Sequence, residues 1–360
     1  MTPFVVEIAQ SSLCVFALSL VVTLLATYLA IGLLRRLNAA QVIQEDGPQA
    51  HKSKAGTPSM GGIAILIGVA AAIPLIRIGV FEQGIKSFAG CYPGFLPVIL
   101  LALTYAIIGF VDDLLTIRPR NGIRGLSSKS KFSLQFIAAA AFVVWIFFCS
   151  PGDELMLPNP HSWLAFGNWF HIDFGWAYIP FAAFFITGMA NFVNITDGLD
   201  GLAAGLTVIL VVVLAGTILL HYTALSAYVY CLVLSALAGA CVAFLWFNFN
   251  PAKIFMGDTG SLAIGALIPA VAIVMKLEIF MIIAGMVFIL DGLSSALQWA
   301  VFKYTRITTG TGRRVFRMSP IHHHFELSGW PEQLVVVRFW IAGIVFGLIA
   351  LLLSALSMMK

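Results

Sequence analysis

Charged residues are scarce in this sequence, and no polar stretch is long enough to form a soluble domain. Of its 360 residues only 10% are Asp, Glu, Lys or Arg, whereas 60% are hydrophobic, and the mean hydropathy is +0.99. This composition excludes an ordinary soluble globular domain. It predicts an integral membrane protein that contacts the lipid bilayer, and no nucleic-acid partner is expected.

Cysteine motifs for metal binding are also missing. The five cysteines are Cys14, Cys91, Cys149, Cys231 and Cys241. They form no CxxC spacing, and most fall in apolar segments, where a free cysteine acts as a small apolar residue. A disulfide between Cys91 and Cys149, both near predicted outer helix ends, stays open. No internal repeat is visible, so the inverted repeats of many transporters are lacking.

Ten apolar segments recur along the chain, each about as long as is needed to span ~30 Å of hydrocarbon. Since lipid offers no partner for backbone groups, segments of this length must be helices. The first one follows residues that carry Glu7 and no Lys or Arg, so we expect a retained anchor rather than a cleaved signal peptide. Residues 1–360 are therefore predicted to form a single all-α membrane domain, with segments at 12–34, 60–80, 94–111, 131–149, 176–193, 202–220, 226–248, 260–276, 278–303 and 333–358.

The distribution of basic residues predicts the orientation of these ten segments. Fifteen of the 20 Lys and Arg residues lie in loops on one side, at 35–59, 112–131, 249–259 and 303–332. The opposite side has Arg77, Lys86, Lys276 and Lys360. By the positive-inside rule the basic loops face the cytoplasm and both termini face outward. The outer loop at 150–175, rich in Pro, Gly and aromatic residues, is expected to contain a short hairpin at the membrane surface.

Polar motifs all fall on the predicted cytoplasmic side. HKSKAGTPSMGG (51–62) and RMSPIHHHFELSGWPE (317–332) precede the second and tenth segments, and FVDDLL (110–115) closes the third. NFVNITDGLDGLAAG (191–205) and FNFNPAKIFMGDTGS (247–261) join the fifth to the sixth and the seventh to the eighth. Five aspartates thus converge on one face: Asp112, Asp113, Asp197, Asp200 and Asp258.

Two interpretations of these aspartates stay open. An aspartate at a helix start is often only a cap for free N–H groups, which fits Asp197 or Asp258 taken alone. Flanking glycines at 198, 201, 257 and 260 instead indicate close approach of a ligand, with exposed N–H groups that bind phosphate. Asp112 and Asp113 end a helix, where the dipole disfavours a carboxylate, so we expect a compensating cation there.

Carboxylates around a hard cation, with lysines nearby, are typical of Mg²⁺ sites that act on phosphate esters. Lys54 and Lys131 are the nearby lysines, although juxtamembrane lysines often only contact anionic lipid headgroups. The run from His322 to His324 is not expected to bind zinc, because three consecutive side chains point in different directions and no cysteine supports such a site. Substrate contact or a hydrogen-bonded surface patch is the expected role.

The ninth segment has one polar face. Asp291, Ser294, Ser295 and Gln298 follow the spacing i, i+3, i+4, i+7, so they lie together on a helix. An ionisable group at this depth normally faces protein or a wet cavity. If this polar face lines a groove beside the phosphate site, the groove would suit a lipid-linked substrate. The alternative is that the polar face makes a contact between helices.

These motifs resemble a known family over nearly the whole chain. The stretches EDGPQAHKSKAGTPSMGG, GFVDD, NFVNITDGLDGLA, WFNFNPAKIFMGDTGSLA and MSPIHHHFELSGWPE are similar to those of the phospho-N-acetylmuramoyl-pentapeptide transferases of the bacterial plasma membrane. DGLDG and MGDTG alone indicate only the wider polyprenyl-phosphate N-acetylhexosamine-1-phosphate transferase superfamily, and PIHHHFE indicates the narrower family.

The resemblance implies a reaction: UDP-MurNAc-pentapeptide and undecaprenyl phosphate give lipid I and UMP, with Mg²⁺ bound by Asp258. It also suggests a homodimer. The uridine pocket would include Phe255 as a stacking face and Asp200, and the histidines would face the sugar and peptide. The implied catalytic residues are Asp112, Asp113, Lys131 and Asp258, and the implied substrate-binding residues are Lys54, Ser59, Asn194, Asp197, Gly198, Leu199, Asp200, Asn248, Phe255, Gly257, Ser261, Gln298, His322, His323 and His324.

Two positions depart from the family pattern: Thr116 stands where many members have lysine, and Asp291 where glutamate is expected. Two alternatives remain open. A sister transferase would move GlcNAc-1-phosphate onto the same lipid, and only the histidine stretch argues against it. A cation-coupled transporter would place its acids near the membrane midplane, whereas five of the six acids discussed lie at the cytoplasmic margin.

Overall fold

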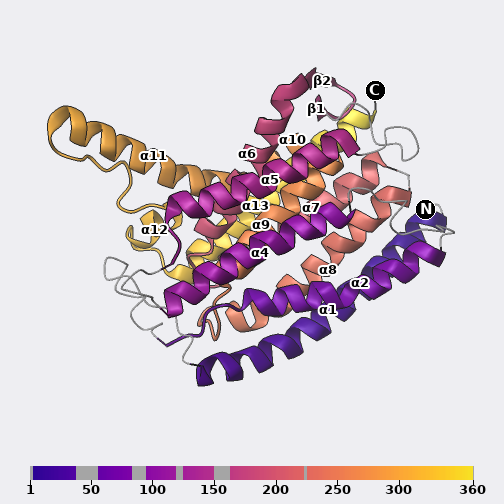
Figure 1. Ribbon diagram of the computed structural model, residues 1–360, viewed down its shortest axis with the longest axis horizontal. Coiled ribbons are helices and arrows are strands. Elements are labelled where there is room, and N and C mark those ends of the chain that lie inside the picture. Colours follow the sequence, from indigo (N-terminus) through magenta and orange to yellow (C-terminus); the bar gives the residue numbers. More distant parts are fainter. Residues whose placement is uncertain are drawn as a thin grey trace.

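The computed structural model describes residues 3–37, 56–82, 95–118, 125–149, 163–222 and 225–359 of the chain. They form a bundle of long helices with one short hairpin at its edge (Figure 1). In chain order the elements are α1 (Pro3–Arg36), α2 (Gly62–Glu82), α4 (Phe95–Ile117), α5 (Ser128–Cys149), β1 (Trp163–Phe166), β2 (Phe170–Asp173), the 3₁₀ turn η2 (Gly175–Ala177), α6 (Tyr178–Thr196), α7 (Leu202–His221), α8 (Leu225–Asn248), α9 (Gly257–Val274), α10 (Glu278–Ala284), α11 (Met286–Thr309), α12 (Ile321–Glu326) and α13 (Glu332–Met358).

Helices occupy all ten apolar segments predicted from the sequence. Within the described ranges, nine helices are long and apolar enough to cross a bilayer. In α2 the apolar helix that can be assessed runs from Gly62 to Leu75 and is shorter. The all-α membrane class is therefore confirmed, and a count of ten crossings stays a prediction.

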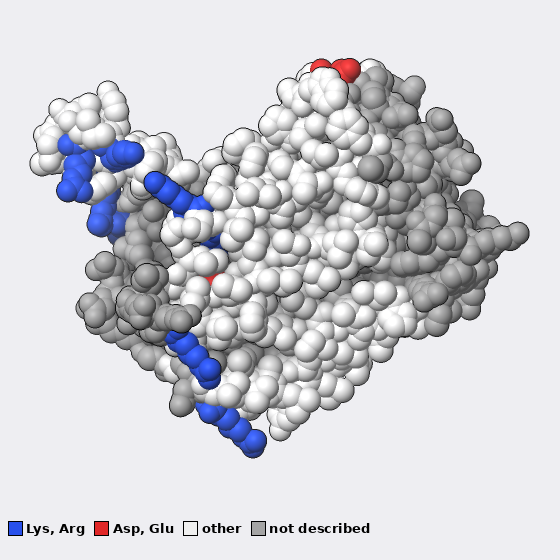
Figure 2. Space-filling model, viewed as in Figure 1, with Lys and Arg blue, Asp and Glu red and all other residues white. Residues whose placement is uncertain are grey.

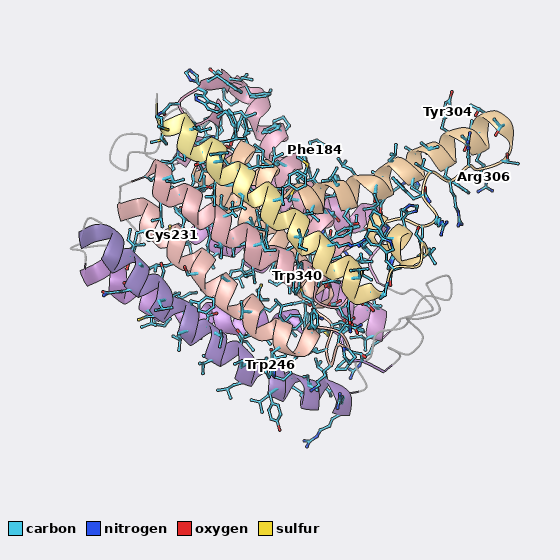
Figure 3. The ribbon with its side chains drawn as sticks, turned by 180° about the vertical axis from the view of Figure 1, so that it is seen from behind. Phe184, Cys231, Trp246, Tyr304, Arg306 and Trp340 are labelled. Carbon is cyan, nitrogen blue, oxygen red and sulfur yellow. The ribbon has the colours of Figure 1, made fainter. Side chains whose placement is uncertain are left out.

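The prediction that the ninth segment (278–303) forms a single helix is wrong. The segment is interrupted at Gly285, where α10 ends and α11 begins. The Gly285 N–H still bonds the Met281 carbonyl (2.8 Å), but its ψ of 12° departs from the helical value and glycine adds no side chain to hold the turn. Beyond the break α11 projects from the bundle, with Tyr304 and Arg306 near its far end (Figure 3).

The most buried helix is α9, which packs against α4 and α6. By contrast, α1 and α13 keep most of their length exposed, as expected of helices that face lipid. α8 lies between α1 and α7 and also contacts α2. The start of α9 is consequently surrounded by the ends of other helices, which is where the polar motifs meet.

The hairpin expected in the outer loop is present in its described part. β1 and β2 pair antiparallel, with Trp163 opposite Asp173 and Phe166 opposite Phe170. Phe166 stacks on Phe280 of α10 at 5.2 Å between ring centroids, so the hairpin is anchored to the bundle. Residues 150–162 lie outside the described residues, as does Cys91, so the question of a disulfide between Cys91 and Cys149 stays open.

The positions of the start of α1 and the end of α13 agree with an even number of membrane crossings. α1 begins and α13 ends at the same end of the bundle (Figure 1). Basic side chains gather at the opposite end on the face shown in Figure 2, including Arg35 and Arg36 in the last turn of α1. Which end faces the cytoplasm stays a prediction.

Candidate active site

An aspartate from another helix caps the start of α9. Asp113 of α4 accepts hydrogen bonds from the N–H groups of Asp258 (3.0 Å) and Thr259 (2.9 Å), and from the Thr259 hydroxyl (2.6 Å). Asp197, which follows α6, lies close to Gly257 and Asp258. Two of the first N–H donors of α9 are therefore satisfied by a carboxylate that also matches the positive end of its dipole.

A glycine on α4 permits this close approach. A Cβ atom at Gly109 would lie only 2.2 Å from the backbone oxygen of Asp258. Asp113 lies one helical turn further along α4, on the same face. The sequence GFVDD thus combines a contact point with α9 and the carboxylate that caps it.

A lysine lies between the other two carboxylates of the cluster. The ammonium group of Lys131, in the first turn of α5, contacts Asp258 Oδ2 directly and lies 3.4 Å from Asp112 Oδ2. Asp112 Oδ1 also accepts the Leu126 N–H (2.6 Å). The side chains of Lys131 and Asp112 are 15% exposed and that of Asp258 is 22% exposed, so a ligand can reach all three. The compensating cation expected beside Asp112 is thus Lys131.

Asn194 completes the surroundings of Asp258. Its side-chain amide donates to Asp258 Oδ1 (2.7 Å) and to Ser261 Oγ (2.9 Å). Ser59 Oγ lies on the other side, 3.0 Å from where a Cβ atom of Gly257 would be. Burial, together with the negative charges of Asp258 and Asp113, holds the pKa of Asp197 well above its usual range. The site therefore has excess negative charge that one lysine does not fully compensate.

The residues predicted on the uridine side fix the loop between α8 and α9. Asp200 is buried, and its Oδ2 accepts the Asn250 side-chain amide (3.1 Å) and the Ala252 N–H (3.0 Å). Asn248 is also buried; it accepts the Gly201 N–H (3.1 Å) and donates to the Ile254 carbonyl (2.9 Å). These contacts position the loop, and contact with uridine stays a prediction.

Phe255 lies in the same loop, next to α2. Its N–H donates to the Pro58 carbonyl (2.8 Å) and its carbonyl accepts the Gly61 N–H (2.8 Å). Phe255 is half-buried, and stacking of its ring on uracil stays a prediction. Leu199 is buried, whereas Gly198 is exposed in the turn before α7. Lys54 lies outside the described residues.

His322 is fully buried against α11. Its Nδ1 lies 2.8 Å from Asp291 Oδ2, and its backbone N–H donates to Asp291 Oδ1 (3.2 Å). Nε2 has no hydrogen-bond partner among the described residues and points toward Gly198, where a Cβ atom would lie 2.5 Å from it. The histidine segment and the 197–201 turn, far apart in sequence, therefore meet at this nitrogen.

The other two histidines have different partners, as predicted for consecutive side chains. His323 Nδ1 lies 2.6 Å from Glu326 Oε2, and His324 Nδ1 accepts the Arg317 N–H (3.1 Å). In the part of the chain described, no three His, Cys, Asp or Glu side chains form a ready-made metal cluster.

The polar face of α11 contacts the histidine segment, and a lipid groove beside this face stays a prediction. Ser294 Oγ accepts the Ile321 N–H (2.8 Å). Gln298 Oε1 accepts the N–H groups of Val315 and Phe316 (both 2.9 Å). Asp291, Ser294 and Gln298 thus hold parts of the segment that leads into α12 and of its first residues, and for Asp291 and Ser294 the predicted polar contact between helices is present.

Two predictions about backbone donors and glycines are also corrected. The N–H groups of Asp258 and Thr259 at the start of α9 are not free to bind phosphate, because Asp113 occupies them. Gly260 does not open the backbone to a ligand either. It packs on Gly62 of α2, and a Cβ atom there would lie 2.7 Å from the Gly62 Cα.

Sequence reasoning missed three residues that hold the site together. Thr259 bonds Asp113, and Asn250 donates to both Asp200 and Glu332 Oε2 (3.0 Å). Glu332 Oε1 also accepts the Asp200 N–H (2.9 Å). Glu332 closes the quoted SGWPE motif, so proximity to the histidines was the signal that could have found it.

The oxygen atoms of the cluster fit a Mg²⁺ ion. Asp112 and Asp258 are part-exposed carboxylates that already share one cation, the Lys131 ammonium group. Mg²⁺ usually takes one or two protein carboxylates, with water and substrate phosphates as its other ligands, so a ready-made protein cage is not required. The donor set of the site agrees with this preference.

Comparisons with known proteins place the chain in a class. Residues 95–276, just over half of the chain, match the family described as glycosyl transferase family 4. Residues 54–66 match the phospho-N-acetylmuramoyl-pentapeptide-transferase signature 1. The chain is thus a membrane protein of glycosyl transferase family 4.

Similar proteins narrow this to one family. The chain is 40% identical to the phospho-N-acetylmuramoyl-pentapeptide-transferase of Shouchella clausii, over 93% of this chain and 95% of the relative. It is 42% identical to that of Pelotomaculum thermopropionicum, over 92% and 94%. It is 39% identical to that of Geobacillus kaustophilus, over 95% and 97%. The chain belongs to the family of phospho-N-acetylmuramoyl-pentapeptide transferases.

Proposed function

We propose that this protein transfers phospho-N-acetylmuramoyl-pentapeptide from UDP to undecaprenyl phosphate, giving lipid I and UMP in a bacterial plasma membrane. The observation that carries the proposal is the cluster of Asp112, Lys131 and Asp258 at the end of a membrane bundle, in a member of this family. Positioning and charge compensation dominate phosphoryl transfer, and this cluster supplies both.

Asp258 is the principal residue proposed to hold Mg²⁺. When bound, the ion would shield the charge of the diphosphate. Asn194 supports this role because its amide fixes one oxygen of Asp258 (2.7 Å) and thereby orients the other. Lys131, which contacts that other oxygen, would exchange part of this contact for substrate phosphate.

Direct attack by the lipid phosphate is the proposed route. An oxygen of undecaprenyl phosphate attacks the phosphorus that bears the sugar, and the bond from that phosphorus to the UMP oxygen breaks. A phosphate monoester has its second pKa near ~6, so at neutral pH it is largely a dianion and needs little help from a base. Asp112 is better suited than Asp113 to steer this group, because Asp113 has both oxygens engaged with α9.

Ten crossings, outward-facing termini and a cytoplasmic catalytic face complete the proposal. Its support is the gathering of basic residues at one end of the bundle (Figure 2). Cysteine labels at the outer hairpin should react from outside the cell, and labels at 317–332 should not. A homodimer is also proposed, and cross-linking in the membrane would test it.

The runner-up activity is transfer of GlcNAc-1-phosphate onto the same lipid. The full chain in lipid nanodiscs, supplied with undecaprenyl phosphate and either UDP-MurNAc-pentapeptide or UDP-GlcNAc, distinguishes the two by the mass of the lipid product. We expect lipid I only. A GlcNAc-linked product alone would require the sister activity.

The route has its own test. Labelled UMP should not exchange into UDP-MurNAc-pentapeptide when the enzyme has been stripped of endogenous lipid phosphate. Exchange under these conditions would mean that the sugar phosphate rests on the enzyme, and direct attack would have to be abandoned.

A further inference from the structure

A groove unrelated to the carboxylate cluster lies between α1, the start of α2 and the end of α8. Its volume is about 1170 Å³, and most of its lining is apolar. The α1 wall runs from Val22 to Arg36, and Met60, Ile63 and Phe247 form much of the opposite wall. Tyr28 on the α1 wall is 70% exposed, so the groove opens to the surroundings of the bundle rather than into its core.

Three cations lie at one end of this groove. Arg35 and Arg36 occupy the last turn of α1, and Lys253 comes from the loop between α8 and α9. Basic side chains are visible along the edge where α1 ends in Figure 2. Among the described residues that line the groove, none is acidic. The groove thus has a long apolar part and a cationic mouth built from two segments far apart in sequence.

We propose that this groove is a binding site for an anionic phospholipid of the bilayer. An acyl chain fits the apolar part, and the headgroup phosphate matches Arg35, Arg36 and Lys253 at the mouth. Basic pockets between helices at the membrane surface bind anionic headgroups, whereas a neutral headgroup gains little from three cations. The long side chains of arginine and lysine reach the interface while their stems stay on apolar surface.

A second copy of the chain fits the groove less well. Two copies in one membrane have the same orientation, so a two-fold interface at this groove would bring both cationic mouths to the same depth. Like charges facing each other oppose such contact. The polyprenyl phosphate substrate is a less suitable occupant, because the groove lies away from the carboxylate cluster. The groove is formed where α1 packs on α2 and α8, whereas the cluster is built from α4, α5 and α9.

The groove shares a wall with the segment that supports the start of α9. Met60 lines the groove, and the next two N–H groups, of Gly61 and Gly62, donate to the carbonyls of Phe255 and Met256 (both 2.8 Å). Lys253 also lines the groove, and it lies two residues before Phe255 in the segment whose carbonyls accept these hydrogen bonds. A lipid in the groove therefore lies beside both partners of the backbone pairing that leads to Gly257.

Native mass spectrometry of the full chain tests the site directly. The protein is titrated with phosphatidylglycerol or with phosphatidylcholine of the same acyl chains. The test variant combines Arg35→Gln, Arg36→Gln and Lys253→Gln. The control combines Lys303→Gln, Arg306→Gln and Arg313→Gln on and after α11, far from Trp246 and the α8 end (Figure 3). Thermal unfolding in detergent checks that both variants fold.

Wild type and control are expected to bind phosphatidylglycerol more tightly than phosphatidylcholine. The test variant should lose about fivefold in phosphatidylglycerol affinity per cation removed, with phosphatidylcholine binding unchanged. Equal losses in both variants, no loss in the test variant, or no preference between the two lipids would overturn the proposal. Efficient disulfide dimers through Tyr28→Cys in membranes would overturn it too, because the groove would then be covered by a second copy.

Discussion

Asp291 Oδ2 and His322 Nδ1 lie 2.8 Å apart, and neither side chain is exposed. The carboxylate thereby orients the imidazole ring, so that Nε2 points at the turn containing Gly198. A carboxylate that accepts from Nδ1–H leaves Nε2 as the acceptor nitrogen, the arrangement that holds a histidine for its task in many sites. Asp291 is thus a positioning residue for the histidine segment.

Replacing this carboxylate should lower activity more than stability. In Asp291→Asn the ring loses a charge-assisted hydrogen bond worth about 2 kcal/mol, so we expect kcat to fall about thirtyfold. Asp291→Glu keeps the carboxylate and should retain most activity. Steady-state kinetics with UDP-MurNAc-pentapeptide provides the measurement. Equal loss in both variants would show that packing, not the charge, is what matters at position 291.

Substitutions of the two neighbouring aspartates of α4 should affect stability and activity differently. Asp113→Ala leaves three donors of α9 without their acceptor, so it should lower the free energy of unfolding by about 2 kcal/mol and also reduce activity. Asp112→Asn should reduce activity while stability is nearly unchanged. Thermal unfolding and UMP release, measured on the same preparations, check both. The reverse pattern would contradict the assignment of Asp113 as the cap.

Close packing at Gly109 gives a prediction with a matched control. Gly109→Ala places a methyl group against the Asp258 backbone, at 2.2 Å in the present geometry, and should cost about 1–3 kcal/mol of stability together with most activity. Gly188 is also within a helix, but a Cβ atom there meets nothing within 4 Å. Gly188→Ala should therefore be neutral or slightly stabilising. Similar losses in the two variants would argue against the contact.

The raised pKa of Asp197 predicts how stability depends on pH without divalent cations. Its folded pKa lies above the unfolded value of about 4, so between these values the native state binds more protons than the unfolded state. Stability therefore falls as pH rises through this window. The Asp197→Asn variant should show a smaller decline of stability with rising pH. Adding Mg²⁺ should also reduce the decline in wild type, because the cation favours the ionised form of the Asp197 carboxyl group. An unchanged slope in the variant would refute the effect.

Composition and patterning were sufficient to predict the helices and the meeting of the polar motifs. Apolar length alone located the membrane segments, because lipid leaves a long apolar run no other structure. The break at Gly285 was not predictable, since glycine is common inside membrane helices. Lys276 was counted among the cations of the outer side, yet it is buried, with its ammonium nitrogen 3.7 Å from Glu278 Oε1. Periodicity does not reveal such pairings.

Within the site, the sequence indicated which residues gather but not what each one contacts. Asp113 and Asp112 are adjacent in sequence, yet one bonds the backbone of α9 and the other lies beside Lys131. That difference depends on the packing of α4 against α9 at Gly109. The same limit applies to Asp200, because its contacts with Asn250 and with Glu332 join a loop and the start of α13, which only the fold brings together.

The central claim is that the cluster of Asp112, Lys131 and Asp258 transfers the sugar phosphate with the help of Mg²⁺. The most direct test is UMP release from UDP-MurNAc-pentapeptide, with undecaprenyl phosphate present, as Mg²⁺ is varied for wild type and Asp258→Asn. Wild type should require Mg²⁺, and the folded variant should show almost no turnover, because an amide is a far weaker Mg²⁺ ligand than a carboxylate. Turnover by the variant at ordinary Mg²⁺, or turnover by wild type without any divalent cation, would contradict the claim.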